Sequence, residues 1–416
     1  MRVRLDWVCS EVRNVVDVAS LGVPEVFHYS IPILDETGDG RTEPANEIGS
    51  GKLRLSGGEV LISKLNPRLP RVLVAEVHEV PTISSTEFIA LRPGRDLETR
   101  FLVYLLQSER ARQFLNGATM SVTRSQQRVR PEVLTKSWWE IPEIRMQRAI
   151  AHYLDAETAR IDALIAKKQL MIDRLLDRRV SSTVLGVAGG WDSAGRVPSG
   201  LPWLESMPEH WRTAKLTLVA RLGSGHTPSR SRPDWWLGCR IPWVTTGEVA
   251  AMRNDRLEYV KETREKISEE GLANSAAVVH PAGTVVLCRT ASAGYSAIMA
   301  SDMATSQDFA TWTCGPLLRP RYLLLCLRAM RGDLLGRLAM GSTHKTIYMP
   351  DIEAIRIPLP PVDEQDQIVD LVWQRLHSID RIVDTTERQI TLLLEHRQAL
   401  ITSAVTGELG TPGVAV

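Results

Sequence analysis

Residues 359–408 read LPPVDEQDQIVDLVWQRLHSIDRIVDTTERQITLLLEHRQALITSAVTGE, and they decide the fold because the chain contains this stretch twice. Residues 141–190 align with them without a gap, at a constant offset that pairs Gln147 with Gln365. Proline, glutamine, aspartate, arginine and glycine are among the identities, so apolar patterning alone does not explain the match. An internal repeat of this length bears on the whole fold, because each copy is expected to form the same structural unit.

Both copies predict long amphipathic helices. Apolar residues recur at spacings of three, four or seven, which places them in one stripe along each helix. Pro142 and Pro360 suit helix starts, where a missing N–H costs little. Gly189 and Gly407 suit helix ends. About 34 residues at 1.5 Å each give a rod of roughly 50 Å.

Each apolar stripe needs a partner, and the matching stripe on the other helix can provide it. An antiparallel coiled coil would bury both stripes and place the segments that precede the helices at opposite ends. The alternative is that each helix packs into its own globular domain. The expected interface residues are Ile150, Leu154, Ile161, Leu164 and Leu175 in the first helix and Ile368, Val372, Ile379, Ile382 and Leu393 in the second.

The two stretches that precede the helices are similar in size and echo each other. A turn leads into a β-rich apolar run at 57–63 and again at 281–287, and later apolar runs at 101–106 and 322–327 predict one helix each. We therefore predict an α+β protein with a pseudo-two-fold internal repeat, in which two long antiparallel helices form a coiled coil between two mixed α/β domains. The predicted parts are an N-terminal domain at 1–140, a first helix at 141–186, a C-terminal domain with its leading joint at 187–356, a second helix at 357–406 and a tail at 407–416.

Composition sets broad limits on the function. Lysine plus arginine number 50 and aspartate plus glutamate 49, so any basic surface must be local rather than global. The five cysteines are scattered without zinc spacing, which favours reduced thiols. Because the start lacks an apolar signal segment and no apolar run approaches about 20 residues, we expect a cytoplasmic protein.

Several motifs together carry a resemblance to a known family. The second helix contains PPVDEQ at 360–365, Ile379-Asp380 and HRQALITSAVTG at 396–407. The second domain opens with GSGHTPSR at 223–230, DWW at 234–236 and IPWV at 241–244, and closes with GSTHK at 341–345. The chain resembles the specificity subunits of Type I restriction-modification systems.

The resemblance implies a division of labour. Each variable domain would be a target-recognition domain that reads one half of a split site on double-stranded DNA, and the helices would set the gap and dock two copies of a DNA methyltransferase subunit. Restriction subunits with motor activity would join the complex. The resemblance implies no cofactor in this chain, since S-adenosylmethionine binds the methylating partner and ATP and magnesium the restriction partner.

A DNA reader needs basic and polar side chains on loops, some to hold phosphates and some to reach base edges. Arginine and lysine match guanine, whereas glutamine and asparagine match adenine. Paired tryptophans at 138–139 and 235–236 are expected to be packing anchors. The candidate DNA-binding residues are Lys64, Asn66, Arg68, Arg124, Gln126, Gln127 and Arg128 in the first domain and His226, Thr227, Ser229, Arg230, Arg232, Arg289, Thr343, His344 and Lys345 in the second.

Motifs for chemistry are missing from the sequence. Asn66-Pro67-Arg68 lacks the second proline and the aromatic residue of an adenine methyltransferase tetrad, and Gly51-Lys52-Leu53 lacks the remaining residues of a P-loop. We therefore expect no catalytic residue and no metal site. Two other hypotheses stay open: a coiled-coil scaffold for protein assembly that does not read DNA, and a DNA endonuclease with an unrecognised site.

Overall fold

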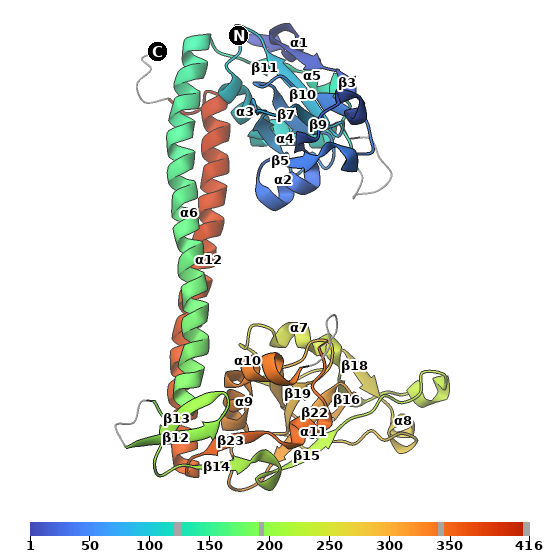
Figure 1. Cartoon of the computed structure of the whole chain (residues 1–416), viewed down its shortest axis with the longest axis vertical. Helices are drawn as coiled ribbons and strands as arrows, with labels where there is room; N and C mark the ends of the chain where they lie inside the picture. The colour runs from blue at the N-terminus through green and yellow to red at the C-terminus, as the bar shows by residue number, and fades with distance from the viewer. Residues whose placement is uncertain (120–126, 191–194, 340–344, 411–416) are drawn as a thin grey trace. The chain divides into compact units, whose positions relative to one another are not determined.

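The computed structural model describes residues 1–119, 127–190, 195–339 and 345–410. The chain divides into two compact units (Figure 1). Unit 1 comprises residues 1–169 and 386–416, and unit 2 comprises residues 170–385. The two predicted long helices are present as α6 (Ile144–Val187) and α12 (Val362–Val405), and each contributes residues to both units.

Unit 1 is built around two sheets. A four-stranded antiparallel sheet has the order β2-β10-β7-β8, and a five-stranded mixed sheet has the order β3-β6-β9-β4-β5. The first sheet consists of β2 (Cys9–Val12), β10 (Phe88–Pro93), β7 (Val60–Ser63) and β8 (Val72–Val74), and the second of β3 (Val15–Val16), β6 (Lys52–Arg54), β9 (Thr82–Ser85), β4 (Glu25–Tyr29) and β5 (Arg41–Pro44). The other elements are the strand pair β1 (Arg2–Arg4) and β11 (Trp138–Glu140) and the helices α1 (Leu5–Val8), α2 (Ile31–Thr37), α3 (Thr99–Gln107), α4 (Glu109–Gly117) and α5 (Pro131–Thr135).

Unit 2 contains a five-stranded sheet of order β15-β22-β19-β20-β17 and a three-stranded sheet of order β18-β16-β21. These strands are β15 (Ala220–Ser224), β22 (Phe309–Cys314), β19 (Val285–Cys288), β20 (Ser296–Met299), β17 (Tyr259–Val260), β18 (Glu265–Ile267), β16 (Ile241–Val244) and β21 (Ala304–Thr305). Two strand pairs are β12 (Arg196–Leu201) with β13 (Leu204–Pro208) and β14 (Arg212–Lys215) with β23 (Arg356–Leu359). The shorter helices are α7 (Val249–Met252), α8 (Glu269–Ala273), α9 (Pro320–Ala329), α10 (Arg331–Asp333) and α11 (Met349–Glu353).

The two units share a local arrangement of strands and one helix. The antiparallel order β2-β10-β7-β8 of unit 1 has the same connectivity as β15-β22-β19-β20 of unit 2. Helix α3 packs on β7 and β8, and α9 packs on β19 and β20. The apolar runs at 57–63 and 281–287 lead into or form strands, and those at 101–106 and 322–327 lie in helices, so these predictions are confirmed. The mixed α/β character of both units is confirmed as well.

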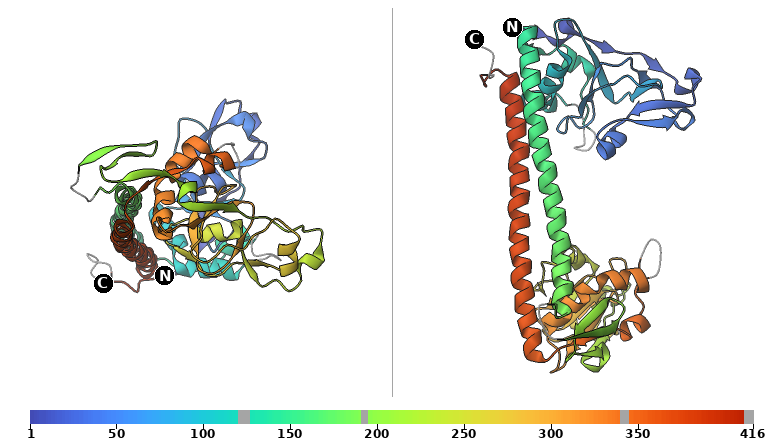
Figure 2. Two further views of the ribbon diagram at one scale, coloured as in Figure 1. Left: turned by 90° about the horizontal axis from the view of Figure 1, so that it is seen from below. Right: turned by 60° about the vertical axis from the view of Figure 1, so that its left-hand side comes forward.

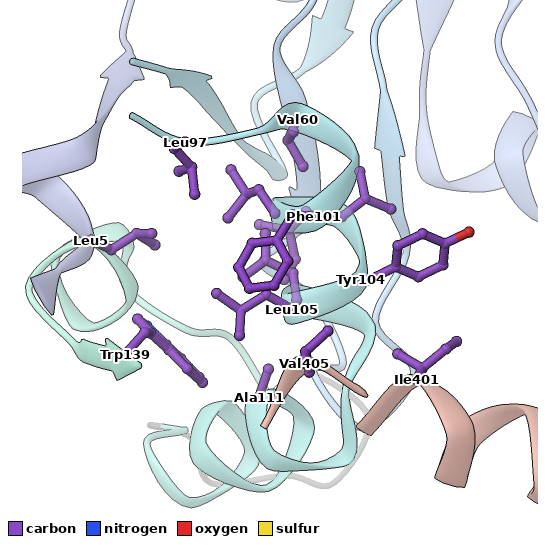
Figure 3. Close-up of a cluster of buried hydrophobic side chains, with 14 of the residues drawn as sticks. Leu5, Val60, Leu97, Phe101, Tyr104, Leu105, Ala111, Trp139, Ile401 and Val405 are labelled. Carbon is purple, nitrogen blue, oxygen red and sulfur yellow. The ribbon is translucent and has the colours of Figure 1, made fainter. Parts of the chain in front are cut away.

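Both long helices enter the hydrophobic core of each unit. In unit 1, Phe101 and Leu105 of α3 pack with Ile401 and Val405 at the end of α12 (Figure 3). The start of α6 joins the same core through residues such as Leu154. In unit 2 the roles of the helices are exchanged, because the core takes in the start of α12 and the end of α6. The residues that these two helices contribute there are Val187, Val369, Val372, Trp373 and Leu376.

The predicted helix ends are confirmed, whereas part of the predicted stripe is wrong. Gly189 and Gly407 have φ values of 62° and 77°, a conformation that glycine adopts without a steric cost. Leu164 and Ile382 are exposed by 43% and 42%, although both were expected in the interface. Each of them lies three positions after a buried isoleucine, a step that turns about 60° around a helix with 3.6 residues per turn, and the residue one position further on is less exposed. Ile172 and Val383 are buried and Ile165 is half-buried. Of the predicted residues, Ile150, Leu154, Ile161, Val372 and Ile379 are buried and Leu175, Ile368 and Leu393 are half-buried.

Helices α6 and α12 lie side by side within each unit (Figures 1 and 2), and an ion pair joins them there. In unit 1, Arg397 donates to Asp162, with a distance of 2.9 Å from Nε to Oδ1, and both side chains are partly exposed. In unit 2, Arg179 donates to Asp380 at the same distance, but only 7% and 11% of these side chains are exposed. The two pairs use corresponding positions of the two sequence copies with donor and acceptor exchanged between the helices.

Asp255, between α7 and β17, joins the helices α6, α9 and α10 of unit 2. Its backbone carbonyl accepts hydrogen bonds from Arg179 of α6 at 2.8 Å and from Arg328 of α9 at 2.7 Å. Its carboxylate accepts from Arg331 at 2.7 Å. Burial lowers the pKa of the Arg328 guanidinium to about 10, and the charge of Asp255 opposes this shift. Asp255 therefore compensates the positive charge of the arginine side chains that are buried around it.

Removal of the buried pair should cost more than removal of the exposed one. We expect Asp380→Ala to destabilise unit 2 by about 3–5 kcal/mol, because it leaves the buried Arg179 without its carboxylate. Asp162→Ala should cost less than about 1 kcal/mol, because its pair is exposed to solvent. Urea denaturation of both variants measures the difference. Equal losses of stability would contradict this reading of the two pairs.

A buried glutamine near the start of each long helix joins it to the segment before a shorter helix. This shorter helix is α3 in unit 1 and α9 in unit 2. In unit 1, Gln147 Oε1 accepts from the backbone N–H of Glu98 at 2.8 Å, and its Nε2 donates to the carbonyls of Asp96 and Pro142 at 2.9 and 2.8 Å. In unit 2, Gln365 makes the same three contacts. Its partners are Arg319 N, Leu317 O and Pro360 O, each at 2.9 Å.

Loss of this amide should destabilise the protein strongly. Gln365→Met keeps the length of the side chain but leaves one N–H and two carbonyls without partners, each of which costs about 1–3 kcal/mol when buried. We expect a loss of about 3 kcal/mol or more. Gln374→Met is the matched control, because Gln374 is exposed on the same helix. Thermal unfolding of the two variants tests the expectation, and similar midpoints would refute it.

Candidate nucleic-acid interface

The candidate residues of unit 1 gather around the end of β7. Lys64 follows this strand, and its Nζ donates to the carbonyl of Thr86 at 2.7 Å. Its backbone N–H donates to Glu87 O at 2.8 Å, and its carbonyl accepts from Val129 N at 3.1 Å. The structure therefore brings the segment after β7, the turn before β10 and the segment that leads to α5 into one polar surface.

Two further candidates complete the surface of unit 1. Asn66 lies in the left-handed region with a φ of 52°, and its N–H donates to Gln127 O at 2.9 Å. Within the described parts of the chain, the side-chain oxygens of Asn66 and Gln127 are buried without a hydrogen-bond partner. Arg128 donates to Glu87 at 3.0 Å, and this hydrogen bond raises the pKa of Arg128. Buried acceptors of this kind call for water or a ligand.

Unit 2 has a corresponding surface at the end of β19. Arg289 follows this strand, and its Nε donates to the carbonyl of Gln307 at 2.9 Å. Its backbone N–H donates to Asp308 O at 2.8 Å, and its carbonyl accepts from Ile347 N at 2.8 Å. These three contacts match those of Lys64 one by one. Each unit therefore presents one basic residue at the same place in the same sheet.

His226 and Thr227 belong to the surface of unit 2, and Lys345 lies two residues before Ile347, whose N–H donates to the carbonyl of Arg289. The N–H of His226 donates to Thr305 O at 3.0 Å, and Thr227 Oγ1 donates to Gln307 Oε1 at 2.6 Å. Lys345 is exposed, with its Nζ 3.5 Å from Leu335 O. Arg124, Gln126, Thr343 and His344 were also predicted to bind DNA and lie outside the described residues.

The remaining arginine candidates are engaged by other side chains. Arg230 pairs with Glu265 at 2.6 Å and stacks on Trp236, with its guanidinium carbon 4.0 Å from the ring centroid. Arg232 pairs with Asp234, and this hydrogen bond raises the pKa of Arg232 and lowers that of Asp234. The pair with Glu265 of β18 joins the segment from 226 to 240 to the three-stranded sheet, whereas the pair of Arg232 with Asp234 lies within this segment.

Two other candidates and the tryptophans have local environments of their own. Ser229 is exposed and shares a hydrogen bond of 2.8 Å with Ser231. Arg68 lines a groove of about 490 Å³ beside α12 in unit 1. Trp139 is buried, and Trp236 packs edge to face on Trp243, as packing anchors should. Trp138 differs, because 45% of its surface is exposed.

Sequence reasoning missed the turn that precedes β10 in unit 1 and β22 in unit 2. Thr86 and Glu87 form this turn in unit 1, and Gln307 and Asp308 form it in unit 2. Each turn follows a short strand and holds a polar pair just before a buried apolar run. The predicted helices at 101–106 and 322–327 differ by 221 positions, and the same offset carried back to the turns pairs Thr86 with Gln307 and Glu87 with Asp308.

The described residues contain neither a cluster of metal ligands nor a helix that could span a membrane. Within residues 1–119, 127–190, 195–339 and 345–410, no three histidine, cysteine or acidic side chains are grouped as metal ligands. In the same ranges, no helix combines the length and the apolar character that crossing a bilayer requires.

Comparison with known proteins connects these surfaces to one family. Residues 208–396 match the Type I restriction modification DNA specificity domain. A Type I restriction enzyme MjaIX specificity subunit of Methanocaldococcus jannaschii is 25% identical over 189 residues, which are 45% of this chain and 42% of that protein. An EcoR124I/EcoR124II specificity subunit of Escherichia coli is 21% identical over 187 residues, which are 44% of either protein. The matched stretch thus spans less than half the length of these relatives.

Solved structures extend the similarity of fold to nearly the whole chain. One, described as showing the structural basis of complex assembly and conformational transition of the type I R-M system, has a TM-score of 0.73 and 20% identity, with 98% of both chains covered. The HsdS subunit of Thermoanaerobacter tengcongensis has a TM-score of 0.54 and 18% identity, with 98% of this chain and 97% of that chain covered. The resemblance inferred from the sequence is confirmed: residues 208–396 belong to the family of Type I restriction modification DNA specificity domains.

Proposed function

We propose that this chain is the DNA-reading specificity subunit of a Type I restriction-modification complex and carries no catalytic activity of its own. The match of residues 208–396 to a DNA specificity domain carries the proposal. The polar surface that His226, Thr227 and Arg289 share supports it, as does the exposed Lys345, because phosphate and base contacts need such side chains on loops.

Each unit reads one half of a split DNA site in this proposal. The support is the shared arrangement of strands and the matching contacts of Lys64 and Arg289. The sheets and loops before α6 and before α12 act as the two recognition domains, with the boundaries predicted above. Since the two surfaces carry different side chains around these residues, the two half-sites differ in sequence.

The long helices set the gap between half-sites as an antiparallel coiled coil with pseudo-two-fold symmetry. The exchanged ion pairs Arg397–Asp162 and Arg179–Asp380 support this part of the proposal. A helix of 44 residues is about 66 Å long at 1.5 Å per residue. That exceeds the roughly 34–36 Å of one turn of DNA, so helices of this length suffice for two half-sites one turn apart.

A groove on the helices of unit 2 is proposed to dock a methyltransferase subunit. It has a volume of about 720 Å³ and lies between α6 and α12. Leu185, Leu371 and Ile382 line it with exposed apolar surface, which gives a reason for the exposure of Ile382. Two copies of the methyltransferase subunit and the restriction subunits complete the complex. S-adenosylmethionine then binds to the methylating partner, and ATP and magnesium bind to the restriction partner.

Mapping of methylated adenines tests the proposal directly. We expect co-expression of this chain with its methyltransferase subunit to methylate adenines in a split motif with a fixed gap. The methyltransferase subunit expressed alone is the control and should leave the same sites unmodified. A continuous motif, or no motif, would refute the proposed function.

Assembly and DNA binding should respond to different substitutions. Ile379→Asp places a charge among the apolar residues between the helices and should abolish the complex in gel filtration, whereas Ile379→Leu should preserve it. Lys345→Ala should leave assembly intact, weaken DNA binding and lower the slope of log affinity against log salt by about 1. A fluorescence titration at several salt concentrations measures this slope, and loss of assembly in both Ile379→Asp and Lys345→Ala would contradict the assignment.

A further inference from the structure

Gln307 occupies a central position on the polar surface of unit 2. It lies in the turn between β21 and β22, and its side chain is exposed. The elements that meet around it are the segment after β15, which contributes Thr227, and the segment after β19, which contributes Arg289. Nothing in the sequence motifs singled this residue out.

The backbone at Gln307 is held from both sides. Its carbonyl accepts from Arg289 Nε at 2.9 Å. The preceding Ser306 is 3% exposed, and its Oγ donates to the carboxylate of Asp308 at 3.1 Å. The same carboxylate accepts from Thr290 Oγ1 at 2.5 Å. Four side chains stabilise this turn, namely those of Arg289, Thr290, Ser306 and Asp308. The backbone position from which the exposed side chain of Gln307 extends is therefore fixed.

The orientation of the Gln307 amide is fixed as well. Thr227 Oγ1 donates to Oε1 at 2.6 Å, which uses one of the two lone pairs of this oxygen. Among the described residues, Nε2 of Gln307 has no hydrogen-bond partner. The amide therefore presents both N–H donors and one remaining acceptor to a ligand.

We propose that Gln307 reads an adenine in the half-site of unit 2 and that Thr227 is its positioning residue. Nε2 donates to N7 of the base and Oε1 accepts from the N6 amino group, which is the bidentate pairing of a glutamine with adenine. This inference rests on the proposed function. Arg230 and Arg232 are bound to Glu265 and Asp234, so they are less suited to this role.

The corresponding residue of unit 1 is a threonine and cannot make the same contact. Thr86 occupies the place of Gln307, since its carbonyl accepts from Lys64 as that of Gln307 accepts from Arg289. A threonine hydroxyl is shorter and makes only single contacts with bases. This turn therefore makes a bidentate contact with adenine in the half-site of unit 2 only.

Methylation mapping of variants in the complex with the methyltransferase subunit tests the inference. Gln307→Ala should keep the split motif and its gap. It should relax the base preference at one position of the motif, where the original chain requires adenine. Preference for adenine there should fall roughly tenfold to a hundredfold, the loss expected for one bidentate contact. Gln113→Ala is the matched control, because Gln113 is an exposed glutamine of α4 paired with Glu109, and it should leave every position unchanged.

Substitutions of Thr227 test the positioning role. Thr227→Val keeps the shape but removes the hydroxyl, and it should relax the same position by a smaller factor, whereas Thr227→Ser should retain the original preference. If Gln307→Ala leaves the preference intact, or relaxes a position that does not require adenine, the inference is wrong. If the original chain itself produces no split motif, the proposed function fails instead, so the two failures are distinguishable.

Discussion

A buried side-chain amide governs how each unit is joined to its long helix. Gln147 and Gln365 are almost fully buried, and each satisfies one backbone donor and two backbone acceptors that no secondary structure provides for. Because an unpaired buried polar group is costly, only one placement of the helix start against the preceding segment satisfies all three. The position of the polar surfaces relative to the helix starts follows from this placement.

The same logic explains the contrast between the two ion pairs. Exposed charges such as Arg397 and Asp162 gain little from each other in water, whereas Arg179 and Asp380 are desolvated and depend on each other and on Asp255. Buried charge thus joins the long helices of unit 2 to the segment around Asp255. The corresponding contact in unit 1 relies on apolar residues of α12, such as Ile401 and Val405, together with a few neutral hydrogen bonds.

The repeat in the sequence predicted the helices, their capping glycines and the main strands, because these depend on local pattern. It failed for Leu164 and Ile382, because a step of three residues and a step of four both suit an apolar stripe, and tertiary contacts decide which of the two is buried. For the site, basic residues after a strand were found, and Lys64 and Arg289 do occupy equivalent places. Gln307 was missed because its neighbours come from β-segments far apart in the chain. Local sequence patterns do not predict which distant segments lie next to each other.

The division of α12 between the two cores bears on the order of events during synthesis. Thr402 accepts a hydrogen bond from the backbone of Glu109, a contact between residues 293 positions apart, and Leu400, Ile401 and Val405 fill the same core. The ribosome makes these residues after the last residue of unit 2, so the N-terminal sheets stay incompletely packed until unit 2 has been translated. Domains usually fold in the order in which they emerge, and here the second unit can close its core before the first.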